Sequence, residues 1–315
     1  MRTPLIESQI QIPHPSKNAK GGVPGQSDKR KLYLKPENLQ PIGAFKLRGA
    51  YNKVASLSEE ERARGVITYS SGNHAQGVAY AARALGVKAV IVMPNNAPPI
   101  KREATAALGA EIVFVGPGSL ERQLKAEELA AEHGYAIVPP YDDEKIIAGQ
   151  GTMGLEILED LPGVETVIVP VGGGGMISGI ATAIKLSKPS INVIGAEPEL
   201  AADAQASLKA GKIVQLEADQ VTRTMADGLR TQSIGKANFE HMRRYVDDIV
   251  TVSEEEIRET VRRLASDPRT RAEPSGAVAL AAFLFHPEEL PKTVVNVVVI
   301  SGGNIEPQLL AELRA

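Results

Sequence analysis

Hydrophobic and polar positions follow two different periods along the chain. Short apolar runs, among them KAVIVMP at 88–94 and VVNVVVI at 294–300, have the length of buried strands. Between them lie stretches in which apolar residues recur at helical spacing, for example LERQLKAEELAAEHG at 120–134. Because strands that are apolar on both faces and alternate with helices form parallel sheets covered by helices, the pattern predicts an α/β protein.

Two of the expected helices begin with a capping box. Ser58 with Glu61, and Ser253 with Glu256, have the spacing at which a serine and a glutamate each bond a backbone N–H at the start of a helix. Further helices are expected at 75–86, 101–109 and 176–186, and further strands at 32–34, 65–69, 110–116, 166–171 and 192–198.

Composition narrows the class of protein. The 315 residues are 43% hydrophobic and 23% charged with a net charge of −3, and they include no long basic block that would attract a nucleic acid. Without cysteine there can be no disulfide or thiolate ligand. The N-terminus has charges and prolines where a secretory signal is apolar, and no apolar run reaches membrane-spanning length. We therefore expect a cytoplasmic protein, with residues 16–30 as a mobile loop.

Three expected strands end in turns of unusual composition, SSGNH, VGGGG and SGGN. Ligands of open α/β sheets bind at the carboxyl ends of strands, so these turns are the first candidates for a site. Gly172 to Gly175 precede an expected helix and predict a phosphate cradle of backbone N–H groups, with a merely tight turn as the alternative. The dinucleotide-binding spacing fails, because Ile177 or Ser178 stands where its last glycine is due.

The turn SSGNHAQG at 70–77 combines hydroxyl, amide and imidazole groups with backbone donors. It would fit a carboxylate, although an ordinary helix N-cap by Ser or Asn explains it equally well. Lys46 follows Phe45 in GAFKLRGA, and a lone lysine is most often a surface charge. Beside a phosphate cradle and a carboxylate-sized turn, however, Lys46 is the group needed to hold pyridoxal phosphate as a Schiff base next to an amino-acid substrate.

Seven motifs occur in the order TPL (3–5), LKPENLQPIGAFKLRGA (34–50), SSGNHAQG, VGGGGMISG, MADG (225–228), EPSG (273–276) and SGGN (301–304). In this order the chain resembles the fold-type-II pyridoxal-phosphate enzymes, which share the tryptophan synthase β-like fold. It is most similar to the branch of serine/threonine dehydratases (threonine ammonia-lyases) and serine racemases. The resemblance implies a homodimer of two-domain subunits, each domain with a mostly parallel sheet covered by helices. Residues 54–142 would form a small domain inserted in a large cofactor-binding domain of residues 1–53 and 143–315.

The resemblance also implies the roles of individual residues. Lys46 would hold the cofactor and remove the Cα proton of the substrate. The ring would lie between Phe45 and Gly228. The full cofactor set would be Phe45, Lys46, Asn73, Gly172, Gly173, Gly174, Gly175, Met176, Gly228, Glu273 and Ser301. The substrate carboxylate would be received by Ser70, Ser71, Gly72, Asn73 and His74, although His74 taken alone is more typical of a structural histidine.

Ser301 would face the ring nitrogen and bears on the reaction. Because a serine does not protonate that nitrogen as an aspartate would, carbanion delocalisation into the ring should be weaker, and loss of a β-hydroxyl is favoured. We therefore expect dehydration and deamination of L-threonine, L-serine or 3-hydroxyaspartate to a 2-oxo acid and ammonia. Ser71 leaves racemisation of serine or aspartate open, because the matching serine of the racemase branch returns a proton opposite the lysine. It could equally serve only to bind the carboxylate.

Two further classes stay open from the residues alone. A nicotinamide-dependent dehydrogenase would use Glu197 on the ribose, but the failed glycine spacing disfavours it. A binding protein without catalysis would have kept the fold and lost turnover, and the presence of Lys46 disfavours that.

The loop GAEPELAADA at 195–204 is similar to the family's cation loop. The resemblance implies that Glu197, the carbonyl of Ala201 and Asp203 bind a hard cation such as Mg²⁺, Mn²⁺ or Ca²⁺. Two acids on a solvated loop are the alternative. Ala44 departs from the family's usual Ser or Thr before the Phe-Lys pair, which bears on substrate preference. From the short stretch after SGGN we expect no regulatory domain and no feedback control by isoleucine.

Overall fold

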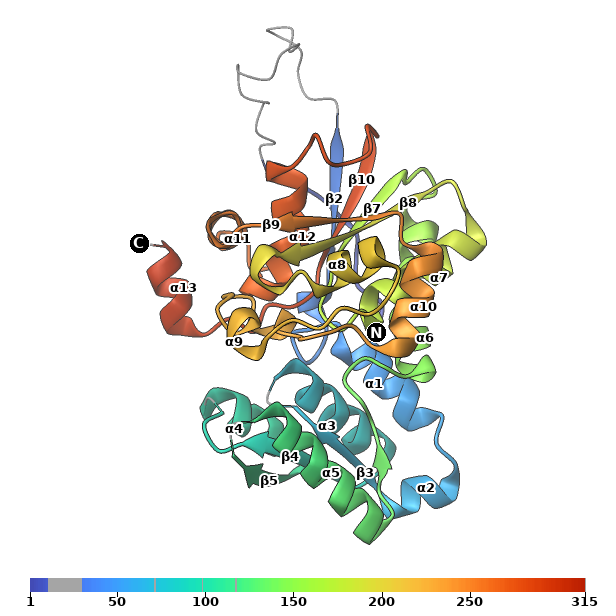
Figure 1. Ribbon diagram of the computed structural model, residues 1–315, viewed down its shortest axis with the longest axis vertical. Helices are drawn as coiled ribbons and strands as arrows, with labels where there is room; N and C mark the ends of the chain where they lie inside the picture. The colour runs from blue at the N-terminus through green and yellow to red at the C-terminus, as the bar shows by residue number, and fades with distance from the viewer. Residues whose placement is uncertain (11–29, 71, 98, 117, 315) are drawn as a thin grey trace, which may run out of the picture.

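The computed structural model describes residues 1–10, 30–70, 72–97, 99–116 and 118–314. In this part of the chain two β-sheets lie in separate regions, each with its own helices (Figure 1). The large sheet has the strand order β1-β2-β10-β7-β8-β9, and the small sheet has the order β5-β4-β3-β6. The strands are β1 (Ile6–Glu7), β2 (Lys31–Pro36), β3 (Val66–Tyr69), β4 (Ala89–Pro94), β5 (Glu111–Val115), β6 (Ala136–Ile137), β7 (Thr166–Pro170), β8 (Asn192–Pro198), β9 (Asp248–Val252) and β10 (Val295–Ile300).

From β2 onward, helices connect successive strands. They are α1 (Lys46–Ala55), α2 (Glu59–Arg64), α3 (Asn73–Leu85), α4 (Pro99–Ala107), α5 (Ser119–His133), α6 (Glu144–Asp160), α7 (Gly175–Ser187), α8 (Asp203–Ala210), α9 (Ala218–Val221), α10 (Lys236–Tyr245), α11 (Glu254–Leu264), α12 (Pro274–Phe285) and α13 (Pro307–Arg314), with short 3-10 turns η1 (Glu37–Leu39), η2 (Glu199–Ala201) and η3 (Asp227–Leu229). Every described strand pair is parallel except β1 with β2. The predicted α/β class is confirmed.

Alternate residues of the large sheet face two different hydrophobic cores. Ile168 and Val298 lie in the core with α11 and α12, whereas their neighbours Val167 and Val297 lie in the core with α6, α7 and α10. Because successive strand side chains point to opposite faces, a strand covered on both sides must be apolar throughout. This explains the uninterrupted apolar runs of the sequence.

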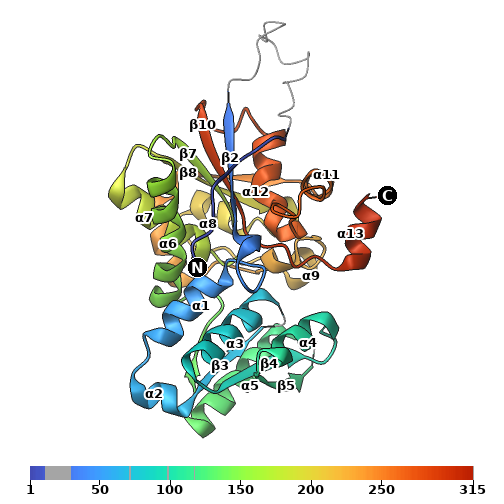
Figure 2. The ribbon, with the colours of Figure 1, turned by 180° about the vertical axis from the view of Figure 1, so that it is seen from behind.

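The small sheet is covered in the same way. Helices α1 and α3 pack on one face with Val66 and Ile91, and α5 packs on the other with Ile67 and Val90 (Figure 2). We call this sheet with α2 to α5 the small unit, and the rest of the described chain the large unit. Helix α1 joins the two, because it packs against both α3 and α6.

A glycine sets how closely α1 approaches the large unit. A Cβ atom on Gly149 of α6 would lie 2.6 Å from the carbonyl oxygen of Arg48 in α1. Only glycine permits this approach of one helix backbone to the other. Since α1 begins at Lys46, the contact helps to fix the position of the Lys46 backbone.

Both predicted capping boxes are confirmed. Ser58 Oγ accepts from the N–H of Glu61 at 3.2 Å, and Ser253 Oγ accepts from that of Glu256 at 3.4 Å, with the reciprocal bonds also formed. Helices α6 and α12 were not expected from the pattern. Most of the expected loop at 16–30, residues 16–29, lies outside the described residues. Within the described chain, no helix has the length and apolar character needed to cross a membrane.

Candidate active site

Lys46 is the first residue of α1, the helix that packs against both α3 of the small unit and α6 of the large unit. Its side-chain nitrogen donates a hydrogen bond of 2.6 Å to the carbonyl of Pro140, and it lies 5.2 Å from the ring centre of Phe45. The N–H of Phe45 bonds the carbonyl of Ser301 at 3.0 Å, which ties the start of α1 to the end of β10. Burial lowers the pKa of Lys46 to about 8. The structure therefore shows a partly buried amine that loses its proton far more readily than a surface lysine.

The glycine loop follows β7 and leads into α7. Gly174 has a φ of +93°, a conformation that favours glycine. The carbonyl of Gly173 accepts from the amide of Asn238 at 2.8 Å and from the N–H of Gly235 at 3.1 Å, which fixes the loop against α10. The first N–H groups of α7 have no acceptor inside the helix and form the positive end of its dipole. The loop therefore has the character of an anion cradle.

Close packing also requires these glycines. A Cβ atom on Gly173 would lie 2.4 Å from ring atoms of Tyr141, and one on Gly172 would lie 3.2 Å from the Cα of Leu229. Close packing thus supports the tight-turn interpretation of these glycines, and the anion cradle stays a prediction that is compatible with it. Met176 is buried in the first turn of α7.

A second cluster joins the end of β10 to the starts of α12 and α3. The amide of Asn73 donates to Glu273 Oε1 at 2.6 Å, and the amide of Asn304 donates to Asn73 Oδ1 at 2.8 Å. Glu273 is also held by its N–H, which bonds the carbonyl of Gly302 at 3.1 Å. Burial, and then the nearby charge of Asp227, raise the pKa of Glu273 to about 7. The cluster brings two of the three predicted turns, SSGNH and SGGN, together with the start of the EPSG motif.

Ser301 and Gly228 meet at Ser275. The hydroxyl of Ser301 is buried and lies 3.5 Å from the carbonyl of Ser275, while Ser275 Oγ accepts from the N–H of Gly228 at 2.9 Å. A Cβ atom on Gly172 would lie 3.5 Å from the carbonyl of Gly228. Gly228, the glycine loop and the end of β10 are therefore neighbours, although they are far apart in sequence.

The turn after β3 is built differently from an ordinary N-cap. The N-cap position of α3 is held by Gly72, which has no side chain. The alternative of a Ser or Asn at the N-cap is therefore wrong. Ser70 Oγ accepts from the N–H of Gly72 at 3.3 Å, and Ser71 lies outside the described residues. The buried imidazole of His74 lies 3.0 Å from the carbonyl of Val138, and burial followed by the charge of Lys46 lowers its pKa to about 3.

Two carboxylates face each other in the predicted cation loop. Glu197 is the last residue but one of β8 and Asp203 begins α8, and both are fully buried. Glu197 accepts from the N–H groups of Ala204 at 3.0 Å and Gln205 at 2.8 Å. Among the described residues neither side-chain oxygen of Asp203 makes a hydrogen bond of good geometry, although Thr231 and the backbone of Ile234 are near enough to act against the rise in its pKa. Burial raises the pKa of both groups, that of Asp203 to about 7, and the charge of Asp203 raises that of Glu197 further. This is not a solvated loop, and its unpartnered oxygens fit a hard cation.

Several residues beside Lys46 were not found from the sequence. Pro140 and Tyr141 contact Lys46 and the glycine loop, and Asp142 accepts from the N–H groups of Lys236 and Ala237 at the start of α10. No local pattern around Tyr141 and Asp142 indicates these contacts, because they form only when the chain has folded. These contacts place the chain segment between β6 and α6 across the candidate site.

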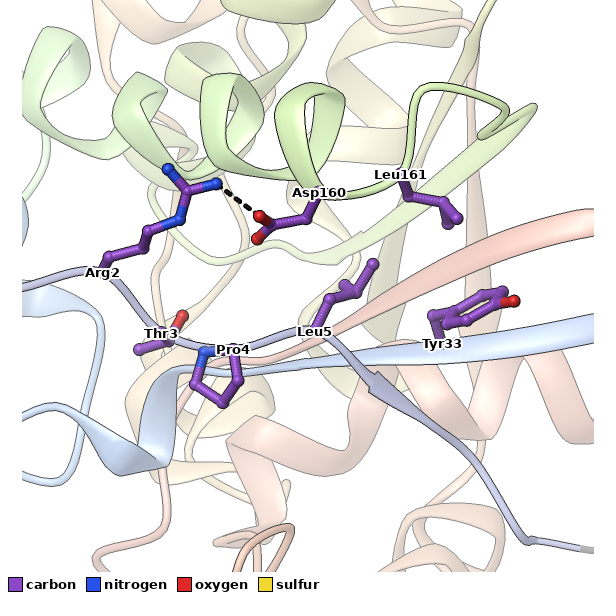
Figure 3. A pocket seen from close by; sticks show the side chains of 7 residues that line it. All are labelled: Arg2, Thr3, Pro4, Leu5, Tyr33, Asp160 and Leu161. Carbon is purple, nitrogen blue, oxygen red and sulfur yellow. Dashed lines mark hydrogen bonds and ion pairs between the residues drawn. The ribbon is translucent and has the colours of Figure 1, made fainter.

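One open cavity lies elsewhere. It has a volume of about 490 Å³ and is lined by Arg2, Thr3, Pro4, Leu5, Tyr33, Asp160 and Leu161 (Figure 3). Arg2 pairs with Asp160 across it. None of the predicted site residues lines this cavity, so it is separate from the cluster around Lys46.

Comparison with known proteins identifies the class of enzyme. The chain matches the family described as "Pyridoxal-phosphate dependent enzyme" over residues 18–302. It is 47% identical over 279 residues to the L-threonine ammonia-lyase of Thermotoga maritima, covering 89% of this chain and 68% of that protein. It is 43% identical over 282 residues to the L-threo-3-hydroxyaspartate ammonia-lyase of Saccharomyces cerevisiae, covering 90% and 85%. The structure of maize serine racemase superposes with a TM-score of 0.86 at 38% identity, covering 90% of this chain and 86% of that one.

The chain therefore belongs to the pyridoxal-phosphate dependent enzymes and has their fold type II. Its residues fit the cofactor on independent grounds. Lys46 offers a partly buried amine with a lowered pKa. The start of α7 offers backbone donors next to glycines at which a Cβ atom would clash with neighbouring residues.

Proposed function

We propose that this enzyme dehydrates and deaminates a β-hydroxy amino acid. L-Threonine and L-serine are the leading candidates for the substrate, and 3-hydroxyaspartate is the next. The observation that carries the proposal is the position of Lys46, a partly buried amine with a pKa of about 8 beside a glycine cradle and a carboxylate-sized turn. The ammonia-lyases of Thermotoga maritima and Saccharomyces cerevisiae support the substrate class.

Bound pyridoxal phosphate would supply an electron sink for the bonds at the substrate Cα. The chain itself must then position the substrate and move a proton. Lys46 accepts the Cα proton in its uncharged form, which its lowered pKa makes more abundant near neutral pH. The β-hydroxyl takes up one proton and leaves as water, which balances the proton removed from Cα. The released enamine then takes up one water and gives a 2-oxo acid and ammonia.

Several groups would hold the cofactor. Phe45 and Gly228 would lie on either side of the ring, Asn73 would bond its hydroxyl, and the glycine loop with Met176 would bind the phosphate. Ser301 would face the ring nitrogen with a neutral hydroxyl, and Glu273 would line the pocket. What supports this set is that hydrogen bonds and backbone contacts join its members at one edge of the large sheet.

The substrate carboxylate would bind at the turn 70–74. The N-terminus of α3 supplies backbone donors for it, because Gly72 leaves that end without a side-chain cap. His74 would contribute as a neutral ring held by the carbonyl of Val138, supporting the turn from behind.

Racemisation of serine, or of aspartate-like substrates, is the second candidate. It is favoured by the 38% identity to maize serine racemase. The proton donor on the face opposite Lys46 would be Ser71.

We also propose a divalent cation, Mg²⁺, Mn²⁺ or Ca²⁺, bound by Glu197, Asp203 and the carbonyl of Ala201. The buried oxygens of Asp203 that lack partners support it. The proposed domain bounds are 54–142 for the small domain and 1–53 with 143–315 for the large one, supported by the separation of the two sheets. A homodimer is a proposal that rests on the resemblance to the family, and a cytoplasmic location is a proposal that rests on the composition of the chain.

The test begins with the visible absorbance of the purified protein, followed by addition of L-serine, L-threonine and L-threo-3-hydroxyaspartate. We expect bound cofactor, formation of 2-oxo acid, and loss of both in Lys46→Ala. The exposed Lys145→Ala on α6 should retain both. The chirality of the recovered amino acid is measured as well. Formation of D-amino acid without 2-oxo acid would support racemisation as the reaction in place of elimination. Absence of absorbance after adding pyridoxal phosphate would contradict both.

A further inference from the structure

An ion pair joins the two units beside the candidate site. Lys101 in α4 of the small unit lies 2.6 Å from Asp227 Oδ2 in η3 of the large unit. The Lys101 side chain is only 17% exposed. The two residues are 126 positions apart in sequence and lie in different units. The contact therefore exists only while the two units are in this arrangement.

The cation of Lys101 faces acidic groups of the large unit. Burial acts against its charge, but the carboxylate of Asp227, together with those of Glu273 and Glu306, raises the pKa of Lys101 above its ordinary value. Glu273 is itself bonded to Asn73 of α3. The lysine is therefore held as a cation at a boundary where the large unit is negative.

Asp227 also connects to the residues that flank the cofactor site. Its Oδ1 lies 3.5 Å from Ser275 Oγ, and Ser275 Oγ accepts from the N–H of Gly228 at 2.9 Å. Gly228 in turn lies against Gly172 of the glycine loop. A displacement of Asp227 by the small unit would therefore be transmitted through Ser275 to Gly228, which lies beside the proposed cofactor site.

We propose that Lys101 and Asp227 form a latch that holds the small unit against the large unit while the amino-acid substrate is bound, and that both are positioning residues for the reaction. The inference rests on the proposed function, because the substrate is the ligand that the two units would enclose between the start of α3 and Lys46. The latch adds to the stability of the closed arrangement only. Without it, a smaller fraction of the enzyme is competent to bind, so apparent affinity falls while the chemical step at saturation is kept.

The test compares Lys101→Met, Asp227→Asn and the double variant with the wild-type holoenzyme. Lys88→Met is the matched control, because Lys88 pairs with Glu111 at 3.0 Å inside the small unit, away from the boundary. For each protein we would measure KM and kcat with the best β-hydroxy amino acid, bound cofactor per chain, and amide hydrogen exchange of 99–107 and 227–229.

We expect each single variant to raise KM about fivefold with little change in kcat, as for loss of an ion pair of this kind. The double variant should be no worse than either single one, because the second change removes a partner already lost. Exchange should rise in both segments together. Cofactor content should stay at one per chain, and the control should match wild type.

Three results would overturn the latch. These are multiplicative KM effects in the double variant, unchanged exchange at both segments, or a fall in kcat and cofactor content with KM kept, as a merely structural defect would give. Failure of the proposed function is recognised separately, because wild-type enzyme would then turn over none of the three substrates. In that case, hydrogen exchange of the holoenzyme without substrate still tests whether the ion pair of Lys101 with Asp227 holds the two segments together.

Discussion

The side-chain nitrogen of Lys46 lies 2.6 Å from the carbonyl oxygen of Pro140, a residue 94 positions later in the chain. Pro140 lies between β6 of the small sheet and α6 of the large unit, so a segment that joins the two units also holds the reactive amine. A backbone carbonyl is an uncharged partner. Because it does not offset the cost of burying an ammonium ion, the amine keeps a lowered pKa.

The first prediction concerns the pH dependence of cofactor uptake. An amine attacks an aldehyde only in its uncharged form, and the pKa of Lys46 is about 8 in place of 10.5. In cofactor-free protein, uptake of pyridoxal phosphate should rise about tenfold per pH unit below that value and level off above it. Stopped-flow absorbance from pH 6 to 10 measures this, with N-acetyl-lysine amide as the unburied reference. A rate that keeps rising to pH 10 would show an ordinary surface-like lysine.

Some parts of this fold could be predicted from the sequence for a clear reason. Strands β4, β7 and β10 are covered on both faces, so they appear as continuous apolar runs. Helix α12 was missed for a related reason: nearly all of its residues are buried, and PSGAVALAAFLF has no amphipathic period to detect. Helix α6 was obscured by the glycines that bring it close to α1 and α7.

The site divides in the same way. Local spacing was enough to propose the glycine loop, the turn at 70–74 and, with the family resemblance, Lys46 as candidates. Tyr141, Asp142 and the pair of Lys101 with Asp227 have no local signature, because their partners lie on other segments and the chain must fold before they meet. These are contacts between distant segments of the chain rather than within a motif.

The second prediction concerns the glycine loop. Gly173→Ala would place a methyl group 2.4 Å from ring atoms of Tyr141, so the loop or the ring must move. We expect a loss of about 1–3 kcal/mol in unfolding free energy, typical of overpacking, and a weaker hold on the cofactor. Gel filtration followed by cofactor assay, and urea denaturation, measure the two effects.

The control for Gly173 is Gly163→Ala, at an exposed position where an added Cβ meets no atom within 4 Å. It should keep both stability and cofactor. If Gly173→Ala behaves like this control, close packing does not restrict the loop, and the cradle must be looser than the contacts with Tyr141 indicate.

The third prediction concerns the cation. Mg²⁺, Mn²⁺ or Ca²⁺ should raise the melting temperature of protein previously treated with a chelator, because bound metal supplies partners for the buried oxygens of Asp203. A cation at 100 times its Kd adds about 2.7 kcal/mol to the unfolding free energy. Asp203→Asn should remove the effect, while Glu199→Gln, exposed in the same loop, should keep it. A gain of equal size in Asp203→Asn would place the cation elsewhere.

The fourth prediction concerns Glu273, whose pKa is raised from 4.5 to about 7 by burial and by Asp227. A carboxyl group with a raised folded-state pKa favours the folded protein below the unfolded-state value, and this contribution is lost as pH rises through the folded-state value. The loss between pH 4.5 and 7 is on the order of 3 kcal/mol. Cofactor-free protein should therefore become less stable across this window in part through Glu273.

Glu273→Gln resembles the protonated side chain and can still accept the bond from Asn73, so it should have nearly wild-type stability at pH 5. At pH 8 it should be more stable than wild type by an amount that approaches that loss, because the variant has no charge to bury. Denaturant unfolding at the two pH values measures the difference, with the exposed Glu217→Gln as the control that should show none. If Glu273→Gln is no more stable than wild type at pH 8, the carboxylate is balanced by Lys101 more fully than its raised pKa indicates.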